Sequence, residues 1–221
     1  MRSRTTVNLL GTVAIVIASL LLTGCPPTNP SSPSLPDNHQ VAASYIHKPS
    51  GMAFPQSVND FQRVNITRYD KEGLDVPVGY DLFDPLRAIA ATVYVYPAPR
   101  VVSIASPPDV VAKAKDIAAK GEFERRKQEI LQAHSGAKLI QEKDISLVQT
   151  GATRLGRMAR FESEDVFANK RQAVEGQVYL FCYVNGDWVI KYRFSYPKSF
   201  DAAKDIDDFM RDLSWAIGDS Q

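Results

Sequence analysis

The stretch QVYLFCYVNGDWVIKYRFSYP, from Gln177 to Pro197, constrains the fold of this chain more than any other feature. Its two runs of alternating aliphatic and aromatic residues are typical of β-strands. Asn185-Gly186 separates the runs, and this dipeptide suits the positive φ angles of a tight hairpin turn. The sequence therefore predicts an antiparallel hairpin over these residues.

Each strand of this predicted hairpin has two distinct faces. One face of the first strand carries Val178, Leu180, Cys182 and Val184, and the other carries Tyr179, Phe181 and Tyr183. One face of the second strand carries Trp188, Ile190, Tyr192, Phe194 and Tyr196, and the other carries Lys191, Arg193 and Ser195. Because Cys182 lies on an inward face, we expect it to be a small core residue rather than a reactive thiol.

Two further strands are predicted earlier in the chain. The segment FQRVNITRY, residues 61–69, alternates Val64 and Ile66 with polar residues, which predicts a half-buried strand. The segment AIAATVYVYP, residues 88–97, is apolar or aromatic on both sides and is therefore predicted to be central in the sheet. One of its faces carries Ile89, Ala91, Val93 and Val95.

A long helix is predicted from Pro107 to His134, with Asp109 near its start. Helical spacing places four apolar residues on one stripe, namely Val110, Ala114, Ile117 and Ala118. We expect Gly121 to interrupt the helix. Beyond it, acids and bases alternate with Glu122–Arg126 and Arg125–Glu129 at i,i+4 spacing, which is typical of a solvated helix face.

A second helix is predicted after Pro197, with Ser199 as a candidate N-cap. Its apolar stripe should pack on the sheet and consists of Ala202, Ile206, Phe209, Met210 and Leu213. Strands and helices thus occur in blocks. This order predicts a single α+β domain over residues 41–221, with a mainly antiparallel sheet packed by a long central helix and a C-terminal helix.

Residues 1–24 have the pattern of an export signal. Arg2 and Arg4 precede an apolar run from Leu9 to Leu22. That run would form about 21 Å of helix, which is shorter than the roughly 30 Å hydrocarbon core of a bilayer. A cleaved signal is therefore favoured over a permanent membrane span.

The signal ends in Leu22-Thr23-Gly24-Cys25, which resembles the lipobox of bacterial lipoproteins. The resemblance implies cleavage between Gly24 and Cys25 and attachment of lipid, including palmitate, to Cys25. Pro26 stands where an aspartate would imply retention in the inner membrane. The resemblance thus implies a cell-envelope protein anchored in the outer membrane and facing the periplasm.

Residues 25–40 contain the lipidated cysteine and a Pro/Ser-rich tether. The tether has five prolines and almost no apolar side chains, so it cannot bury enough surface to fold. Proline favours extended polyproline II geometry, which predicts a semi-rigid spacer of up to about 45 Å.

Several segments of the predicted domain resemble a group of uncharacterised proteobacterial envelope proteins. They are SYIHKPSGMAFP (44–55), FQRVNITRYD (61–70), GYDLFDPLRAIAATVYVYPAP (79–99) and DWVIKYRFSYP (187–197). The order of elements also resembles the PsbP-like α-β-α sandwich. Neither resemblance implies an activity, so neither supplies catalytic residues.

The sequence argues against several classes of chemistry. The formal net charge is +1 over 221 residues, which disfavours nucleic-acid binding. His47 and His134 lie near no G-x-S-x-G elbow, and no His pair or second domain cysteine could complete a zinc site. GATRLGRM has Arg157 and Met158 where a P-loop needs Lys and Ser or Thr. We therefore predict no metal, no cofactor and no catalytic residue.

A basic surface is the one candidate binding site. Its members are Arg154, Arg157, Arg160, Lys191 and Arg193, with tyrosines beside them. Clustered on one sheet face, these side chains would hold an anionic ligand such as a lipid headgroup, a glycan phosphate or an acidic protein patch. The alternative is that they only keep an exposed sheet face soluble.

Two hypotheses for function follow. The first is a membrane-anchored envelope lipoprotein that acts as a non-enzymatic binding or assembly accessory module, with a protein, glycan or lipid partner. The second is a periplasmic hydrolase or other enzyme with an unrecognised site. A cleft with a buried acid beside His47 or His134 would favour the enzyme, whereas a surface without such a cleft would favour binding.

Overall fold

The computed structural model describes residues 44–84, 86–102 and 104–215. The predicted signal (1–24), the Cys25 lipidation site and the predicted tether (25–40) lie outside the described residues. The described residues belong to one compact unit.

The described chain forms ten strands and two helices. In chain order they are β1 (Ser44–His47), β2 (Met52–Pro55), β3 (Ser57–Val58), β4 (Phe61–Ile66), β5 (Val76–Phe83), β6 (Ala88–Pro97), α1 (Pro108–Ala133), β7 (Lys138–Gln149), β8 (Ala152–Phe167), β9 (Lys170–Val184), β10 (Trp188–Pro197) and α2 (Ala203–Asp212).

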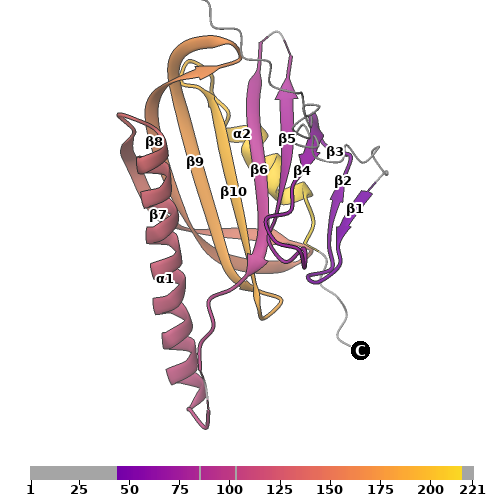
Figure 1. The fold of residues 1–221 in the computed structure, drawn as a ribbon, viewed down its shortest axis with the longest axis vertical. Coiled ribbons are helices and arrows are strands. Elements are labelled where there is room, and N and C mark those ends of the chain that lie inside the picture. The colour runs from indigo at the N-terminus through magenta and orange to yellow at the C-terminus, as the bar shows by residue number, and fades with distance from the viewer. Residues whose placement is uncertain (1–43, 85, 103, 216–221) are drawn as a thin grey trace, which may run out of the picture. The chain divides into compact units, whose positions relative to one another are not determined.

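Eight of the strands form one antiparallel sheet in the order β3-β4-β5-β6-β10-β9-β8-β7, and β1 and β2 pair separately (Figure 1). The centre joins segments far apart in sequence, since Val93 of β6 lies opposite Tyr192 of β10. The predicted α+β fold, with its antiparallel sheet, central helix and C-terminal helix, is confirmed. The central place of residues 88–97 is confirmed as well.

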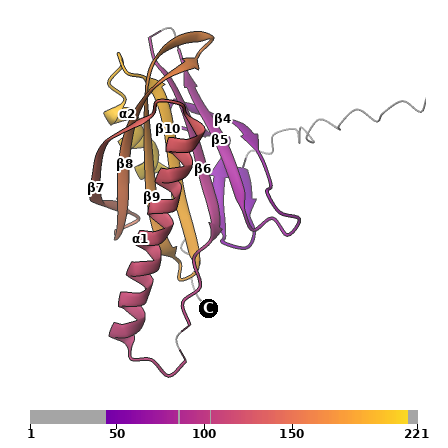
Figure 2. The same ribbon diagram turned by 60° about the vertical axis from the view of Figure 1, so that its left-hand side comes forward.

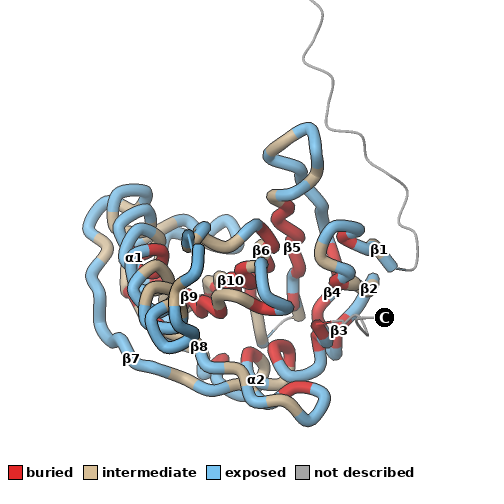
Figure 3. Tube along the Cα trace, turned by 90° about the horizontal axis from the view of Figure 1, so that it is seen from below, coloured by how far each residue is buried: buried red, intermediate tan, exposed pale blue. Residues whose placement is uncertain are grey.

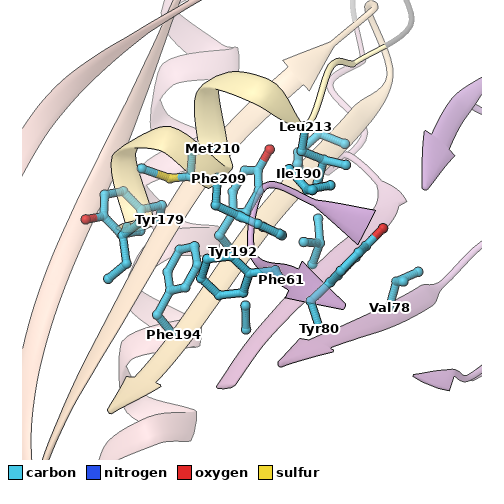
Figure 4. Packing of buried hydrophobic residues seen from close by; sticks show 14 of the residues in the cluster. Phe61, Val78, Tyr80, Tyr179, Ile190, Tyr192, Phe194, Phe209, Met210 and Leu213 are labelled. Atoms are coloured by element: carbon cyan, nitrogen blue, oxygen red, sulfur yellow. The ribbon is translucent and has the colours of Figure 1, made fainter. Parts of the chain in front are cut away.

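The larger core lies between the sheet and α2 (Figure 4). The whole predicted stripe of α2 is buried there: Ala202, Ile206, Phe209, Met210 and Leu213. The face of β6 that carries Ile89, Ala91, Val93 and Val95 is buried in the same core. Ser199 does not cap α2, because the helix begins later and Asp201 Oδ1 accepts a hydrogen bond from the Ala203 amide at 3.1 Å.

The opposite face of the sheet carries α1 (Figure 2). A smaller core lies between this helix and the sheet. This core consists of Tyr96, Phe123, Ala159, Phe161, Val178, Leu180 and Val189. Figure 3 shows that buried residues gather in the central strands and α2, while α1 and β7 are largely exposed.

The prediction for α1 was wrong in two respects. The helix runs through Gly121 without a break, and Pro108 at its first turn has the fixed φ that suits this position. The expected stripe is not buried, since Val110 and Ile117 are 50% and 61% exposed. The apolar contacts between α1 and the sheet come from its C-terminal half, through Phe123 and its neighbours.

Two predicted strand faces also need correction. In β4, Arg63 is buried and Val64 and Ile66 are exposed, because the Arg63 guanidinium donates to the Phe54 carbonyl oxygen from inside the fold. In β9, a bulge at Tyr183, which has a φ of 60°, turns Val184 into the α2-side core. The predicted turn at Asn185-Gly186 is confirmed, with φ angles of 49° and 89°.

Candidate functional site

Two adjacent pockets lie between the C-terminal half of α1 and the sheet. We call them the Lys191 pocket, of about 220 Å³, and the His134 pocket, of about 240 Å³. Ile130 and Arg193 line both. The Lys191 pocket has a polar lining that includes Tyr69, Asp75, Tyr94, Tyr96, Arg126, Glu129, Lys191 and Arg193.

Strand alternation positions Lys191 in this pocket. Its neighbours Ile190 and Tyr192 face the α2-side core, so Lys191 must point toward α1. On that face Lys191 lies between Tyr94 of β6 and Leu180 of β9. Its Nζ atom sits 3.6 Å from the centroid of the Tyr94 ring, a cation–π contact.

The Lys191 ammonium is a buried charge without a counterion among the described residues. Lys191 is only 9% exposed. Its ammonium forms no ion pair and no hydrogen bond with any other described residue. Burial and, to a smaller extent, the nearby guanidinium of Arg126 lower the pKa of Lys191 to about 8. The Tyr94 ring offsets part of the cost of burying this charge, and a carboxylate or phosphate in the pocket would offset more.

Arg126, unlike Lys191, already has counterions, because two glutamates on its own helix pair with it. Its Nε donates to Glu122 at 2.7 Å, and its Nη1 donates to Glu129 at 2.7 and 2.9 Å. The Tyr96 hydroxyl also donates to Glu122 at 2.8 Å and holds this helix turn against β6. The predicted Glu122–Arg126 pair therefore exists, but Glu122 is buried rather than on a solvated face.

Arg193 connects the two pockets through His134. The Arg193 guanidinium donates to Nε2 of His134, and Nδ1 of the same ring lies 2.8 Å from Asp165 Oδ2. An accepting Nε2 requires the proton on Nδ1, which then donates to Asp165. The bond from His134 lowers the pKa of Asp165. Because Nε2 already accepts a hydrogen bond from a cation, it is not free to act as a general base.

The structure does not bring together the five predicted basic residues. Arg157, Lys191 and Arg193 lie on the α1 side of the sheet, as their cross-strand partners Leu180 and Val178 do. Arg160 lies opposite Gln177 on the α2 side, where it pairs with Glu175 at 3.7 Å.

Alternation along β8 places Arg154 on the α2 side as well. Arg157 pairs with Asp116 and Asp144 at 3.4 and 3.3 Å and does not line the Lys191 pocket. The predicted surface of five cations is therefore incorrect, because residues of one strand with odd and even numbers face opposite sides. Only Lys191 and Arg193 share a pocket.

The other candidate residues of the sequence, His47, Cys182 and the GATRLGRM segment, are parts of the packed fold. His47 is fully buried, with Nδ1 2.6 Å from Ser50 Oγ and Nε2 2.8 Å from the Gly73 carbonyl oxygen, and burial lowers its pKa. Cys182 is a free thiol packed against the α1-side core, and burial raises its pKa to about 11. Residues 152–158 belong to strand β8, a geometry that does not suit a P-loop.

Sequence reasoning missed Asp75, Arg126 and Glu129 as members of the pocket. Asp75 comes just before β5, in a segment whose glycines and prolines predict a loop but give no sign of a binding residue. The charges of α1 form a regular pattern, and nothing in that pattern distinguishes the turn that meets the sheet. The sequence feature that could have located the pocket is Lys191 itself, because it is a charged residue in a strand of aromatic and aliphatic neighbours.

No protein-family model matches the chain, and no curated protein is detectably similar to it. Within residues 44–84, 86–102 and 104–215, no cluster of three or more His, Cys, Asp or Glu side chains could hold a metal ion. No helix in the described part of the chain is long and apolar enough to cross a membrane.

Proposed function

We propose that the folded domain is a non-enzymatic binding module that takes a small anionic ligand in the Lys191 pocket. We further propose that the chain is a lipid-anchored lipoprotein of the bacterial envelope, with Cys25 as the lipidated residue. The observation that carries the first proposal is a buried lysine that lines a pocket and has no carboxylate partner among the described residues.

Electrostatics favours an anion at this position. Burying an ammonium without a counterion is costly, so a charge-assisted hydrogen bond from Lys191 to a ligand would recover part of that free energy. Arg193 lines the same pocket and adds positive charge. Glu129 is a weaker competitor for Lys191 because it already accepts two hydrogen bonds from Arg126.

The volume limits the size of the ligand. A pocket of about 220 Å³ is smaller than the roughly 300–1,000 Å³ typical of sites for drug-sized molecules. It fits a single acidic group with a few carbons, or one phosphate, rather than a protein patch. An anionic lipid headgroup or glycan substituent would have to enter by its acidic end.

The enzyme hypothesis has less support. His134 does lie beside an acid in a pocket, but the Asp165 side chain is 44% exposed and Arg193 already donates to the second ring nitrogen. A histidine held in this way is better suited to positioning Arg193 than to accepting a proton from a substrate.

The test is to measure the affinity of the domain for propionate and for inorganic phosphate by NMR titration of backbone amides. We expect the Lys191→Gln variant to bind the preferred anion at least about tenfold more weakly, since a hydrogen bond to a charged group contributes about 1.5–3 kcal/mol. The matched control is Lys143→Gln, which removes an exposed lysine on the α2 side of the sheet. Equal affinity in all three proteins, or no binding by the wild type, would overturn the proposal.

A further inference from the structure

The Lys191 pocket also contains an acid without a partner. Asp75 lines the pocket, and its carboxylate makes no ion pair and accepts no hydrogen bond within the described residues. Its Oδ1 atom is sealed from solvent as well as unpaired. Buried polar atoms in native proteins nearly always have a partner, so an unpaired carboxylate oxygen beside a pocket indicates that a donor is missing.

The nearby cations do not supply that donor. Arg126 is bound to Glu122 and Glu129, and Arg193 donates to His134. Lys191 and Asp75 line the same pocket but are not joined by an ion pair. The pocket therefore presents an ammonium and a carboxylate that do not pair with each other, and a ligand that satisfies both needs an acidic group and a hydrogen-bond donor.

We infer that the ligand is a small zwitterion, an acid that also carries a protonated amine. Its acidic group would bind the Lys191 ammonium, and its amine would bind the Asp75 carboxylate once that side chain turns to bring Oδ1 to the pocket. This inference rests on the proposed binding function of the pocket and specifies the ligand class.

The chemistry favours an amine over a hydroxyl at the Asp75 end. A carboxylate forms shorter and stronger hydrogen bonds with a charged donor than with a neutral one. Burial raises the pKa of Asp75, which is the expected effect on a carboxylate that lacks a counterion, and a bound ammonium would oppose this rise. The ring of Tyr69, which also lines the pocket, offers a further surface for a cationic group.

The experiment compares matched ligands that differ only in the amine. The pairs are alanine and β-alanine against propionate, and 4-aminobutanoate against butanoate, so that three spacings between acid and amine are sampled. We expect one amino acid to bind wild-type protein at least about tenfold more tightly than its matched acid. In the Asp75→Asn variant, the ratio of the affinity for the amino acid to that for its matched acid should fall to about one, while propionate still binds. Asp207→Asn, on α2 at the opposite face, is the matched control and should keep the preference.

The outcomes separate this inference from the proposed function. If Lys191→Gln loses propionate binding but no amino acid is preferred, or if the preference survives in Asp75→Asn, the anion site stands and the zwitterion inference is wrong. If propionate, inorganic phosphate and the amino acids all fail to bind wild-type protein, both proposals fail. Retained propionate binding by Asp75→Asn also shows that this variant is folded.

Discussion

Replacing Phe209 with alanine is expected to lower the free energy of unfolding by about 3–5 kcal/mol. Phe209 is fully buried at the centre of the α2-side core (Figure 4). Its ring centroid lies 4.6 Å from that of Phe61, 5.3 Å from that of Tyr80 and 5.8 Å from that of Phe194. Truncation would leave a cavity bordered by rings on three strands, which cannot easily collapse to fill it.

Urea unfolding of the isolated domain measures this effect. The matched control is Phe83→Ala, because Phe83 is 77% exposed and an exposed side chain should change stability by no more than about 0.5 kcal/mol. If Phe209→Ala were as stable as Phe83→Ala, the packing of α2 on the sheet described above would be wrong.

Replacing Cys25 with alanine is expected to abolish both lipid labelling and stable membrane association. Each buried CH₂ group of an acyl chain contributes about 0.8 kcal/mol, so a lipoprotein with several chains should not dissociate from the membrane unaided. Without the cysteine, the chain loses the only group that the lipobox resemblance assigns to attachment. Incorporation of labelled palmitate in bacterial cells and fractionation of their membranes measure the two effects.

The Cys182→Ala variant is the matched control for this experiment. Cys182 packs against the α1-side core and burial raises its pKa to about 11, so it should not be acylated. We expect its removal to leave palmitate labelling unchanged. Equal labelling of wild-type protein and Cys25→Ala would contradict the lipoprotein proposal.

Much of the fold could be predicted because local patterns and the final packing agree. The hairpin turn at Asn185-Gly186 and the stripe of α2 follow from turn chemistry and helical spacing alone. Alternation failed where the chain departs from regular geometry. The bulge at Tyr183 reverses the side on which Val184 lies, and a tertiary contact with the Phe54 carbonyl allows Arg63 to be buried.

The pocket was harder to predict than the fold. Lys191 and Arg193 were identified because alternation along a single strand places them on one face. Asp75 and Arg126 come from a loop and a helix far away in sequence, and only the packing of α1 on the sheet brings them to the same pocket. The grouping with Arg154 and Arg160 was wrong because nearness in sequence along β8 does not determine which side of the sheet a residue faces.

The central claim is that an anion binds the Lys191 ammonium, and an NMR titration of the lysine side chains with and without propionate tests it most directly. In the free protein, burial together with Arg126 and Arg193 lowers the pKa of Lys191 to about 8, against the effects of Glu129 and Asp75. An anion binds the protonated amine more tightly, so it must raise this pKa, and affinity must fall as the pH rises through the free-protein value. We predict a higher Lys191 pKa at saturating propionate or, where phosphate is the preferred anion, at saturating phosphate; a pKa that both anions leave unchanged would contradict the claim.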